Sequence, residues 1–175
     1  PWVLNCQAPD EGNMHTLLHW GTDEQKERYL RPLCDGTAMS CFAMTEPEVA
    51  GSDPTLIRTT AVQDGDEWVV NGQAANTAFL VDLPSDGWNR VREVETMHGA
   101  TGHSEIVIED LRIPAANMLG GRGQGHLLGQ YRLGPARLAH CMRWIAQAET
   151  ALDMMVERSL QRYSHGSVLA EKQGI

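Results

Sequence analysis

The sequence predicts an α+β protein, with helices at both ends and an antiparallel β region between them. Apolar residues recur every three or four positions from Asn13 to Trp20 and again from Tyr29 to Leu33, which is the spacing of a helix face. The period changes to two between Leu56 and Val70, as in half-buried strands. It returns to three and four from Leu133 to Leu160. These observations divide the chain into a helical part, a β part and a second helical part.

Two short helices are expected near the start of the chain. The first runs from Asn13 to Trp20 and ends at Gly21, which is typical of a helix C-cap. Thr22 and Gln25 then have the spacing of a capping box, in which each side chain bonds the backbone N–H of the other residue. The second helix is expected to run to about Pro32.

A β-hairpin is predicted next, with alternation from Leu56 to Val62, a turn at Asp64-Gly65-Asp66 and a second strand from Trp68 to Val70. Further strands are expected at residues 79–83, 91–95 and 104–109. The middle of the chain is therefore predicted to be a β domain.

A long helix is predicted from Arg132 to about Leu160, with Pro135 tolerated in its first turn. Gly120 to Gly125 lacks the spacing of a phosphate-binding loop and is interpreted as a hinge between domains. Roughly 27 residues give a rod of about 40 Å, which cannot cover its own apolar stripe. Partner helices are therefore expected from further sequence or from another subunit.

Composition and charge exclude several classes of function. The net charge of −9, with only 14 Lys and Arg residues, argues against nonspecific nucleic-acid binding, which needs clustered cations. No apolar run approaches the length of a membrane span, and we expect a soluble intracellular protein. The four cysteines and seven histidines lack metal-binding spacings, so no metal site is predicted and the thiols are expected to be reduced.

The stretch from Cys41 to Asp53 has the clearest chemical content. Its apolar run to Met44 predicts a strand, and the following turn through Gly51 and Ser52 exposes backbone N–H groups. Such a turn suits a phosphate or the edge of a flat polar heterocycle. A strand followed by an ordinary surface turn is the alternative.

At these residues the sequence resembles the acyl-CoA dehydrogenase family, whose flavin-binding strand ends in a Thr-Glu-Pro segment followed by a Gly-Ser-Asp turn. The match is Thr45-Glu46-Pro47 and Gly51-Ser52-Asp53, with the spacing of the larger relatives, and A-P-D-x-G-N-M at Ala8 to Met14 points to the same branch. Gly21 to Leu33 resembles the family's G-T-x-E-Q-K-x-R-Y-L-x-P-L. The resemblance implies the end of an N-terminal helical domain (1–40), a middle antiparallel β-barrel or sandwich domain (41–131) and the first long helix of a C-terminal helical bundle (132–175).

The family carries a further segment after the Asn-Gly at Asn71 and Gly72, whereas here Gln73 is followed directly by Ala74. Two explanations remain open: the protein has a true deletion, or the segment is present in the protein but missing from this sequence. Deleting central strands would leave unpaired strand edges, so we expect the native protein to contain the segment.

The resemblance implies FAD as the cofactor and assigns residues to its site. Phe42, Met44 and Thr45 match positions that line the isoalloxazine ring, with the Thr45 hydroxyl donating to the ring edge. Gly51 and Ser52 match the turn beside the cofactor, and Ser52 also the side of the turn that faces CoA. A threonine that caps its own turn is the competing interpretation of Thr45.

Two further matches lie near the end of the chain. Arg162 and Ser164 match a motif whose arginine reaches the FAD of a neighbouring subunit, and a guanidinium suits a pyrophosphate because it donates paired hydrogen bonds. His165 stands where the family usually has phenylalanine. Arg137 matches an arginine near the acyl-CoA site, although Gly134 replaces the family's aspartate. A solvated Arg162 and a salt-bridged Arg137 are the alternatives.

The resemblance implies an FAD-dependent dehydrogenase that desaturates an acyl-CoA thioester. A carboxylate removes the α-proton and the flavin accepts the β-hydride. The family's carboxylate comes from the C-terminal bundle, so we expect no catalytic base within this chain, despite Glu46 and Glu48. The resemblance also implies electron-transfer flavoprotein or a similar protein as the electron acceptor. The implied assembly is a homodimer or homotetramer. The rival hypothesis is a non-catalytic subunit that binds flavin or CoA on the same scaffold.

Overall fold

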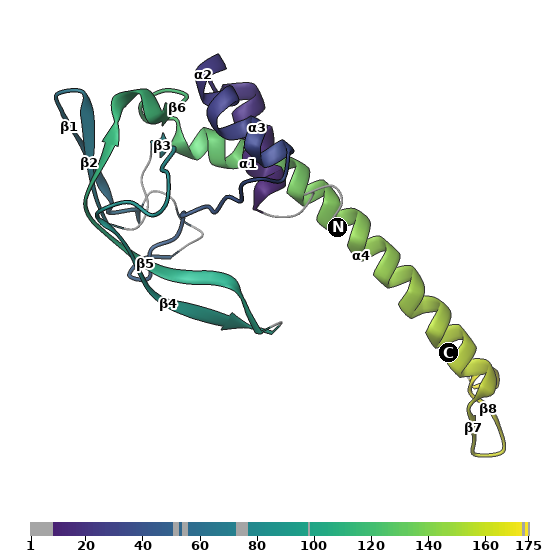
Figure 1. Ribbon diagram of the computed structural model, residues 1–175. Helices are drawn as coiled ribbons and strands as arrows, with labels where there is room; N and C mark the ends of the chain where they lie inside the picture. The colour runs from purple at the N-terminus through teal and green to yellow at the C-terminus, as the bar shows by residue number, and fades with distance from the viewer. Residues whose placement is uncertain are drawn as a thin grey trace. The chain divides into compact units, whose positions relative to one another are not determined.

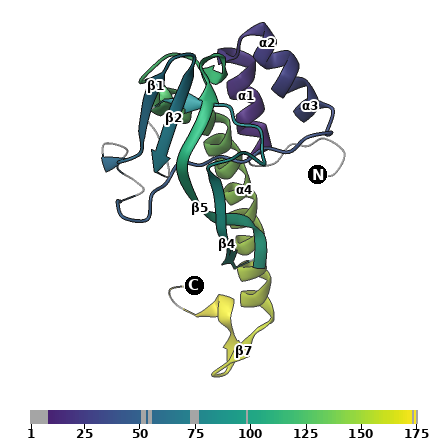
Figure 2. The same cartoon turned by 60° about the vertical axis from the view of Figure 1, so that its left-hand side comes forward.

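The chain forms two units in this computed structural model, which describes residues 9–50, 53, 56–72, 77–97, 99–172 and 174. The first unit is Pro1–Leu133 and the second is Gly134–Ile175. The helices and the main antiparallel sheet belong to the first unit, and most of the long C-terminal helix belongs to the second (Figures 1 and 2). The mixed helical and antiparallel fold confirms the predicted fold class.

The N-terminal helices agree closely with the sequence pattern. Helix α1 spans Asp10–Trp20, and a second helical segment follows as α2 (Asp23–Gln25), a π-helical turn (Lys26–Leu30) and α3 (Arg31–Cys34). The predicted capping box is present: Thr22 Oγ1 accepts from Gln25 N at 3.2 Å and Gln25 Oε1 accepts from Thr22 N at 3.1 Å.

Gly21 ends α1 as predicted, but for a different reason than a left-handed cap. Its backbone is extended (φ −74°, ψ 147°), and its N–H donates to Leu17 O. A Cβ atom at Gly21 would lie 2.6 Å from that same carbonyl oxygen. Glycine is therefore needed because the chain passes too close to the last turn of the helix.

The main sheet is antiparallel with the strand order β1-β2-β5-β4. Its strands are β1 (Thr60–Asp64), β2 (Glu67–Gly72), β4 (Trp88–Thr96) and β5 (Gly99–Pro114). Strand β5 is long enough to pair with β4 through its first half and with β2 through its second half (Figure 1). The predicted β-hairpin is confirmed as β1 and β2, although the strand pairing begins at Thr60 rather than Leu56.

A second, small sheet pairs β3 (Ala78–Phe79) with β6 (Met118–Leu119). The predicted strand from Phe79 to Leu83 is thus only a short β-bridge at its first residue. Across the described residues the main sheet is open, with β1 and β4 at its edges, so the predicted barrel closure is not seen there.

The core has two parts. Five residues of β2 and β5 cover one face of the sheet, namely Trp68, Val70, Ile108, Leu111 and Ile113. A second cluster of four leucines joins the helices to β6 and to the first turns of the C-terminal helix: Leu17, Leu33, Leu119 and Leu128. Burial of these side chains fixes the helices against the β region within the first unit.

Gln25 adds a polar link to that junction. Besides closing the capping box, its Nε2 donates to Ala116 O at 2.8 Å and to Met118 O at 2.9 Å. The residue is 5% exposed. One side chain therefore caps a helix and satisfies two carbonyl groups beside β6.

The predicted strand from Cys41 to Met44 is wrong. This segment is extended but pairs with no strand among the described residues. Helix α1 supplies its partners instead: Asn13 Nδ2 donates to Cys41 O at 3.3 Å, and the Asp10 carboxylate accepts from Ser40 N at 2.6 Å. A short apolar run cannot distinguish a strand from an extended segment that is held by side chains.

Helix α4 spans Gly125–Gln161 and is longer than predicted. Pro135 therefore lies inside the helix rather than in its first turn, so the backbone bond from residue 135 to the carbonyl of Tyr131 is lost. The boundary between the two units falls next to this point, between Leu133 and Gly134.

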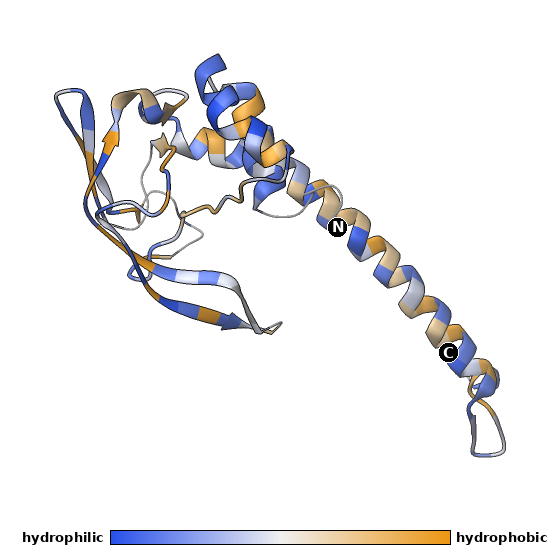
Figure 3. Ribbon diagram, in the orientation of Figure 1, coloured by the Kyte–Doolittle hydropathy of each residue, from blue (hydrophilic) through white to orange (hydrophobic). Residues whose placement is uncertain are grey.

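In the second unit, α4 continues to Gln161 and is followed by a hairpin of β7 (Tyr163–Ser164) and β8 (Ser167–Val168). Apolar and polar residues alternate along the helix (Figure 3). Large apolar side chains stay more than half exposed within the described chain, among them Leu138, Met142, Trp144, Ile145, Leu152, Met155 and Leu160. The predicted need for covering partners therefore stands.

Candidate functional site

A cavity of about 760 Å³ lies in the first unit. It is lined by α1, by the extended segment 38–46, by β3 with the residues that follow it, and by the first turns of α4. Most lining side chains are apolar, and the wall carries two hydrogen-bonded polar groups, one around Arg132 and one around Asp82. Its volume is within the range of small-molecule and cofactor sites, about 300 to 1,000 Å³.

Three predicted site residues lie together on the wall of this cavity: Phe42, Met44 and Thr45. Phe42 and Met44 are each 42% exposed, which is high for large apolar side chains. Within the described chain no group hydrogen-bonds the Thr45 hydroxyl, so Thr45 does not cap its own turn there. Gly51 and Ser52 lie outside the described residues, and their assignment stays a prediction.

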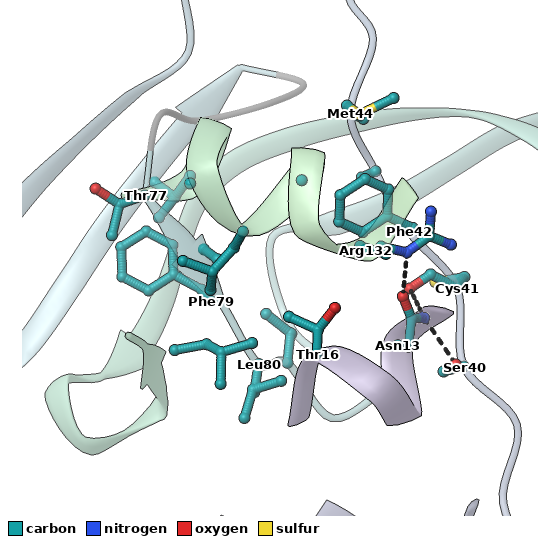
Figure 4. Close-up of a pocket in the computed structure, with 18 of the residues that line it drawn as sticks. Asn13, Thr16, Ser40, Cys41, Phe42, Met44, Thr77, Phe79, Leu80 and Arg132 are labelled. Atoms are coloured by element: carbon teal, nitrogen blue, oxygen red, sulfur yellow. Dashed lines mark hydrogen bonds between the residues drawn. The ribbon is translucent and has the colours of Figure 1, made fainter. Parts of the chain in front are cut away.

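One end of the cavity is a polar corner that the sequence did not reveal (Figure 4). Arg132 of α4 donates from Nε to Asn13 Oδ1 at 2.6 Å, and Asn13 Nδ2 donates to Ser40 Oγ at 2.8 Å. The Arg132 guanidinium lies 4.3 Å from the centroid of the Phe42 ring, a cation–π contact. Burial lowers the pKa of Arg132 from its ordinary value.

Gly12 makes this corner possible. A Cβ atom at Gly12 would lie 2.9 Å from Arg132 Cγ, and the residue is buried. Arg132 and Asn13 are 119 positions apart, so no local pattern could have paired them.

Asp82 also lines the cavity, and it accepts from Arg28 Nη2 at 2.6 Å and from Tyr29 Oη at 3.1 Å. Burial first, and then the Asp82 charge, raise the pKa of Tyr29. Asn117 completes the group by donating to Tyr29 Oη at 3.1 Å. This group contains the Asp82–Arg28 ion pair, whereas Arg132 pairs with no carboxylate among the described residues.

Glu46 is the other carboxylate of interest on the cavity wall, and its oxygens are occupied. They accept from Arg58 N and Thr59 N at 2.9 Å each and from Thr59 Oγ1 at 2.6 Å. The residue is 6% exposed. Glu46 therefore ties the end of the extended segment to the residues just before β1, which is a structural task rather than that of a base.

The remaining predicted residues, Arg137, Arg162 and Ser164, belong to the second unit. Arg137 is exposed on α4. Arg162 is exposed at the end of that helix, where its N–H donates to Arg158 O at 2.9 Å. Ser164 Oγ lies 2.7 Å from His165 Nδ1. His165 and Gly166 both have positive φ (50° and 86°), so the residue at the family's phenylalanine position forms part of a tight turn.

Two searches of the described residues are negative. No cluster of three or more His, Cys, Asp or Glu side chains could hold a metal ion there. No described helix has the length and apolarity to cross a membrane.

The structure thus defines an α+β protein with a cavity of small-molecule size between its helices and its sheet. Comparisons with known proteins identify the family. The chain is 38% identical to acyl-CoA dehydrogenase family member 11 of Gallus gallus, with 97% of this chain and 26% of the relative covered. It is 39% identical to the Mycobacterium tuberculosis protein named "Probable acyl-CoA dehydrogenase FadE2", with 98% and 50% covered. No protein-family model matches.

Among solved structures, butyryl-CoA dehydrogenase from Megasphaera elsdenii is 29% identical with a TM-score of 0.75, and 91% of this chain and 49% of that chain are covered. The chain therefore belongs to the acyl-CoA dehydrogenase family, which confirms the resemblance seen in the sequence. It spans about a quarter to a half of the length of these curated relatives.

Proposed function

We propose that the full-length protein is an FAD-dependent acyl-CoA dehydrogenase that desaturates an acyl-CoA thioester between its α and β carbons. The observation that supports this most directly is the cavity wall formed by Phe42, Met44 and Thr45. These are the three residues that the family resemblance assigns to the isoalloxazine ring, and all three line the cavity. A cavity of about 760 Å³ with an apolar lining and few polar groups also fits a flat heterocycle or an acyl chain.

In this proposal the chain supplies one wall of the site. Phe42 and Met44 exclude water from it, and the Thr45 hydroxyl is available to donate a hydrogen bond to the ring edge. Arg162 and Ser164 would hold the pyrophosphate of a neighbouring subunit's cofactor. Gly51, Ser52 and Arg137 would contact cofactor or substrate. The flavin, when bound, supplies the two-electron acceptor that no side chain offers.

The base that removes the α-proton is proposed to lie outside this chain. Glu46 and Asp82 line the cavity, but their oxygens already accept hydrogen bonds from neighbouring groups. Taking up a proton would break these bonds, which makes both carboxylates poor bases. A carboxylate from a C-terminal bundle is the better candidate for general base catalysis.

The test is an anaerobic titration of the full-length protein with acyl-CoA thioesters of short, long and branched chains. We expect at least one thioester to bleach the flavin absorbance and to support reduction of an artificial electron acceptor. Thr45→Val should slow that reaction by about fivefold, because a hydrogen bond worth about 1 kcal/mol is lost. Thr60→Val, at an exposed site of β1 that does not line the cavity, is the matched control.

Flavin that binds but is reduced by none of these thioesters would contradict dehydrogenation and favour the alternative, a non-catalytic flavin- or CoA-binding subunit. Absence of bound flavin would contradict the dehydrogenase and would leave only a subunit that binds CoA. We further propose electron-transfer flavoprotein or a similar acceptor as the partner, and a homodimer or homotetramer as the assembly. The compartment would be the cytoplasm in a bacterium, or mitochondria or peroxisomes in a eukaryote.

A further inference from the structure

Arg132 is a cation on the wall of a largely apolar cavity. Burial lowers its pKa, and within the described residues no carboxylate forms an ion pair with it. Other arginines of the first unit differ: Arg28 and Arg31 pair with Asp82 and Glu27 at 2.6 and 2.7 Å. Keeping a partly buried charge without a counterion is unfavourable. Such a residue is expected to have a use at the site.

The Arg132 side chain is also fixed in place. Nε donates to Asn13 Oδ1 at 2.6 Å, Nη2 donates to Pro9 O at 3.3 Å, and the guanidinium stacks on Phe42. Gly12 leaves room for its aliphatic stem. A guanidinium has five N–H donors, and these two bonds to described residues leave further donors at the cavity. The neighbouring hydroxyls of Thr16 and Ser40 already donate to Gly12 O and to the Asp10 carboxylate, so the unused donors at this part of the cavity are those of Arg132.

A positioned guanidinium with unused donors is a receptor for an oxyanion, because it offers paired, charge-assisted hydrogen bonds. The source of the oxyanion follows from the surroundings. Most of the cavity is lined by apolar side chains such as Leu80 and Phe79, which suit a hydrocarbon chain. An oxyanion that reaches Arg132 through such a cavity is best attached to that hydrocarbon.

We propose that Arg132 is a specificity-determining residue that binds an oxyanion carried by the acyl group of the substrate. The substrate class is thus acyl-CoA thioesters whose chain bears a second acidic group, of which a distal carboxylate is the simplest. This inference rests on the proposed function, since it assumes that an acyl thioester occupies the cavity. Asn13 is the positioning residue, because its amide oxygen holds Nε.

The experiment uses the full-length flavin-loaded protein and measures dissociation constants by calorimetry. Two thioesters of equal chain length are compared, one ending in a methyl group and one in a carboxylate. We expect the wild-type protein to bind the carboxylate form about tenfold more tightly. Arg132→Met should remove this preference and leave binding of the methyl form unchanged. Arg132→Lys should restore part of it, since it keeps the charge but not the fork.

Arg31→Met is the matched control: it removes the same charge from an exposed helical position that does not line the cavity, and it should keep the preference. Free CoA and a pantetheine thioester without phosphates test the other possible source of the oxyanion, which is a phosphate of CoA itself. If Arg132→Met weakens the binding of free CoA but not the binding of the pantetheine thioester, Arg132 binds a phosphate of CoA and the inference is overturned.

The wild-type comparison needs no variant, so a poorly folded Arg132→Met protein does not remove the test. Equal or tighter binding of the methyl form by the wild-type protein overturns the inference and leaves the proposed function intact. Binding of neither thioester overturns both. Equal weakening of both thioesters by Arg132→Met assigns Arg132 a purely structural role and overturns the inference.

Discussion

Replacing Glu46 by glutamine distinguishes a structural carboxylate from a catalytic base. The Glu46 oxygens accept two backbone N–H groups and one hydroxyl, from Arg58 and Thr59. Glutamine keeps one carbonyl oxygen but turns an NH₂ group toward one of these donors. At least one donor therefore loses its acceptor, and the bonds that remain lose their charge assistance.

The magnitude follows from those losses. A partly buried donor without an acceptor costs about 1 to 3 kcal/mol, and weaker remaining bonds add about 1 kcal/mol. We expect Glu46→Gln to lower the free energy of unfolding by about 2 to 4 kcal/mol, a large part of a typical 5 to 15 kcal/mol. The assay is thermal unfolding of the full-length protein, followed by circular dichroism and by flavin release, together with acceptor reduction.

Glu48→Gln is the matched control, because Glu48 is an exposed carboxylate two residues further along the same segment. It should leave the unfolding temperature and the flavin content unchanged. If Glu46→Gln folds and binds flavin like the wild-type protein but has lost turnover, the structural assignment is wrong and Glu46 is the base.

Three other perturbations test separate parts of the description. Gln25→Ala should lower the free energy of unfolding by about 2 to 4 kcal/mol, because a cap is lost and two carbonyl groups lose their donor, whereas Thr22→Ala should cost only about 1 kcal/mol. Burial, and then the Asp10 charge, raise the pKa of Cys41, so less thiolate is present at a given pH. Although Cys41 as a residue is exposed, we expect iodoacetamide to modify it more slowly than Cys141 at pH 8, as measured by peptide mass spectrometry.

Arg162→Ala should weaken flavin retention after gel filtration, and an unchanged flavin content would favour a solvated arginine.

The sequence predicts local features correctly where the interacting residues are close neighbours in the chain. The capping box of Thr22 and Gln25 and the β1–β2 hairpin were both found this way, because their partners are a few positions apart. The segment from Cys41 to Met44 was misjudged because its partners come from α1, about 30 positions away. Its residues were still recognised as part of a site, because the family resemblance depends on their identity and not on strand pairing.

Long-range pairs account for what the sequence did not show. Gln25 was predicted only as a cap, although its amide also bonds carbonyl groups more than 90 positions away. Arg132 lay at the start of the predicted helix and carried no motif. The apolar spacing predicts a helix start near Arg132, with Pro135 in the first turn, whereas α4 begins ten residues before that proline. Gly125 and Gly129 in the first turns weaken the helix signal there, because glycine is a poor helix former.

The last prediction concerns the junction between Gln73 and Ala74. The alignment with the Gallus gallus relative extends over 204 positions, more than the 175 residues of this chain, so the relative has residues with no counterpart here. Before the junction, Gly72 packs closely on Thr59: a Cβ atom at Gly72 would lie 2.4 Å from Thr59 Oγ1. Thr59 lines the cavity, and so does Thr77, which follows the junction. Gly72 and Thr77 are the described residues nearest to the junction.

We expect the native protein to contain such a segment, and tryptic mapping can detect it. The printed sequence has no Lys or Arg between Arg58 and Arg90, so it yields one peptide, residues 59–90, that spans the junction. In digests of the native protein this peptide should be missing, while the peptide that ends at Arg58 should be found. Recovery of the intact 59–90 peptide would show a true deletion.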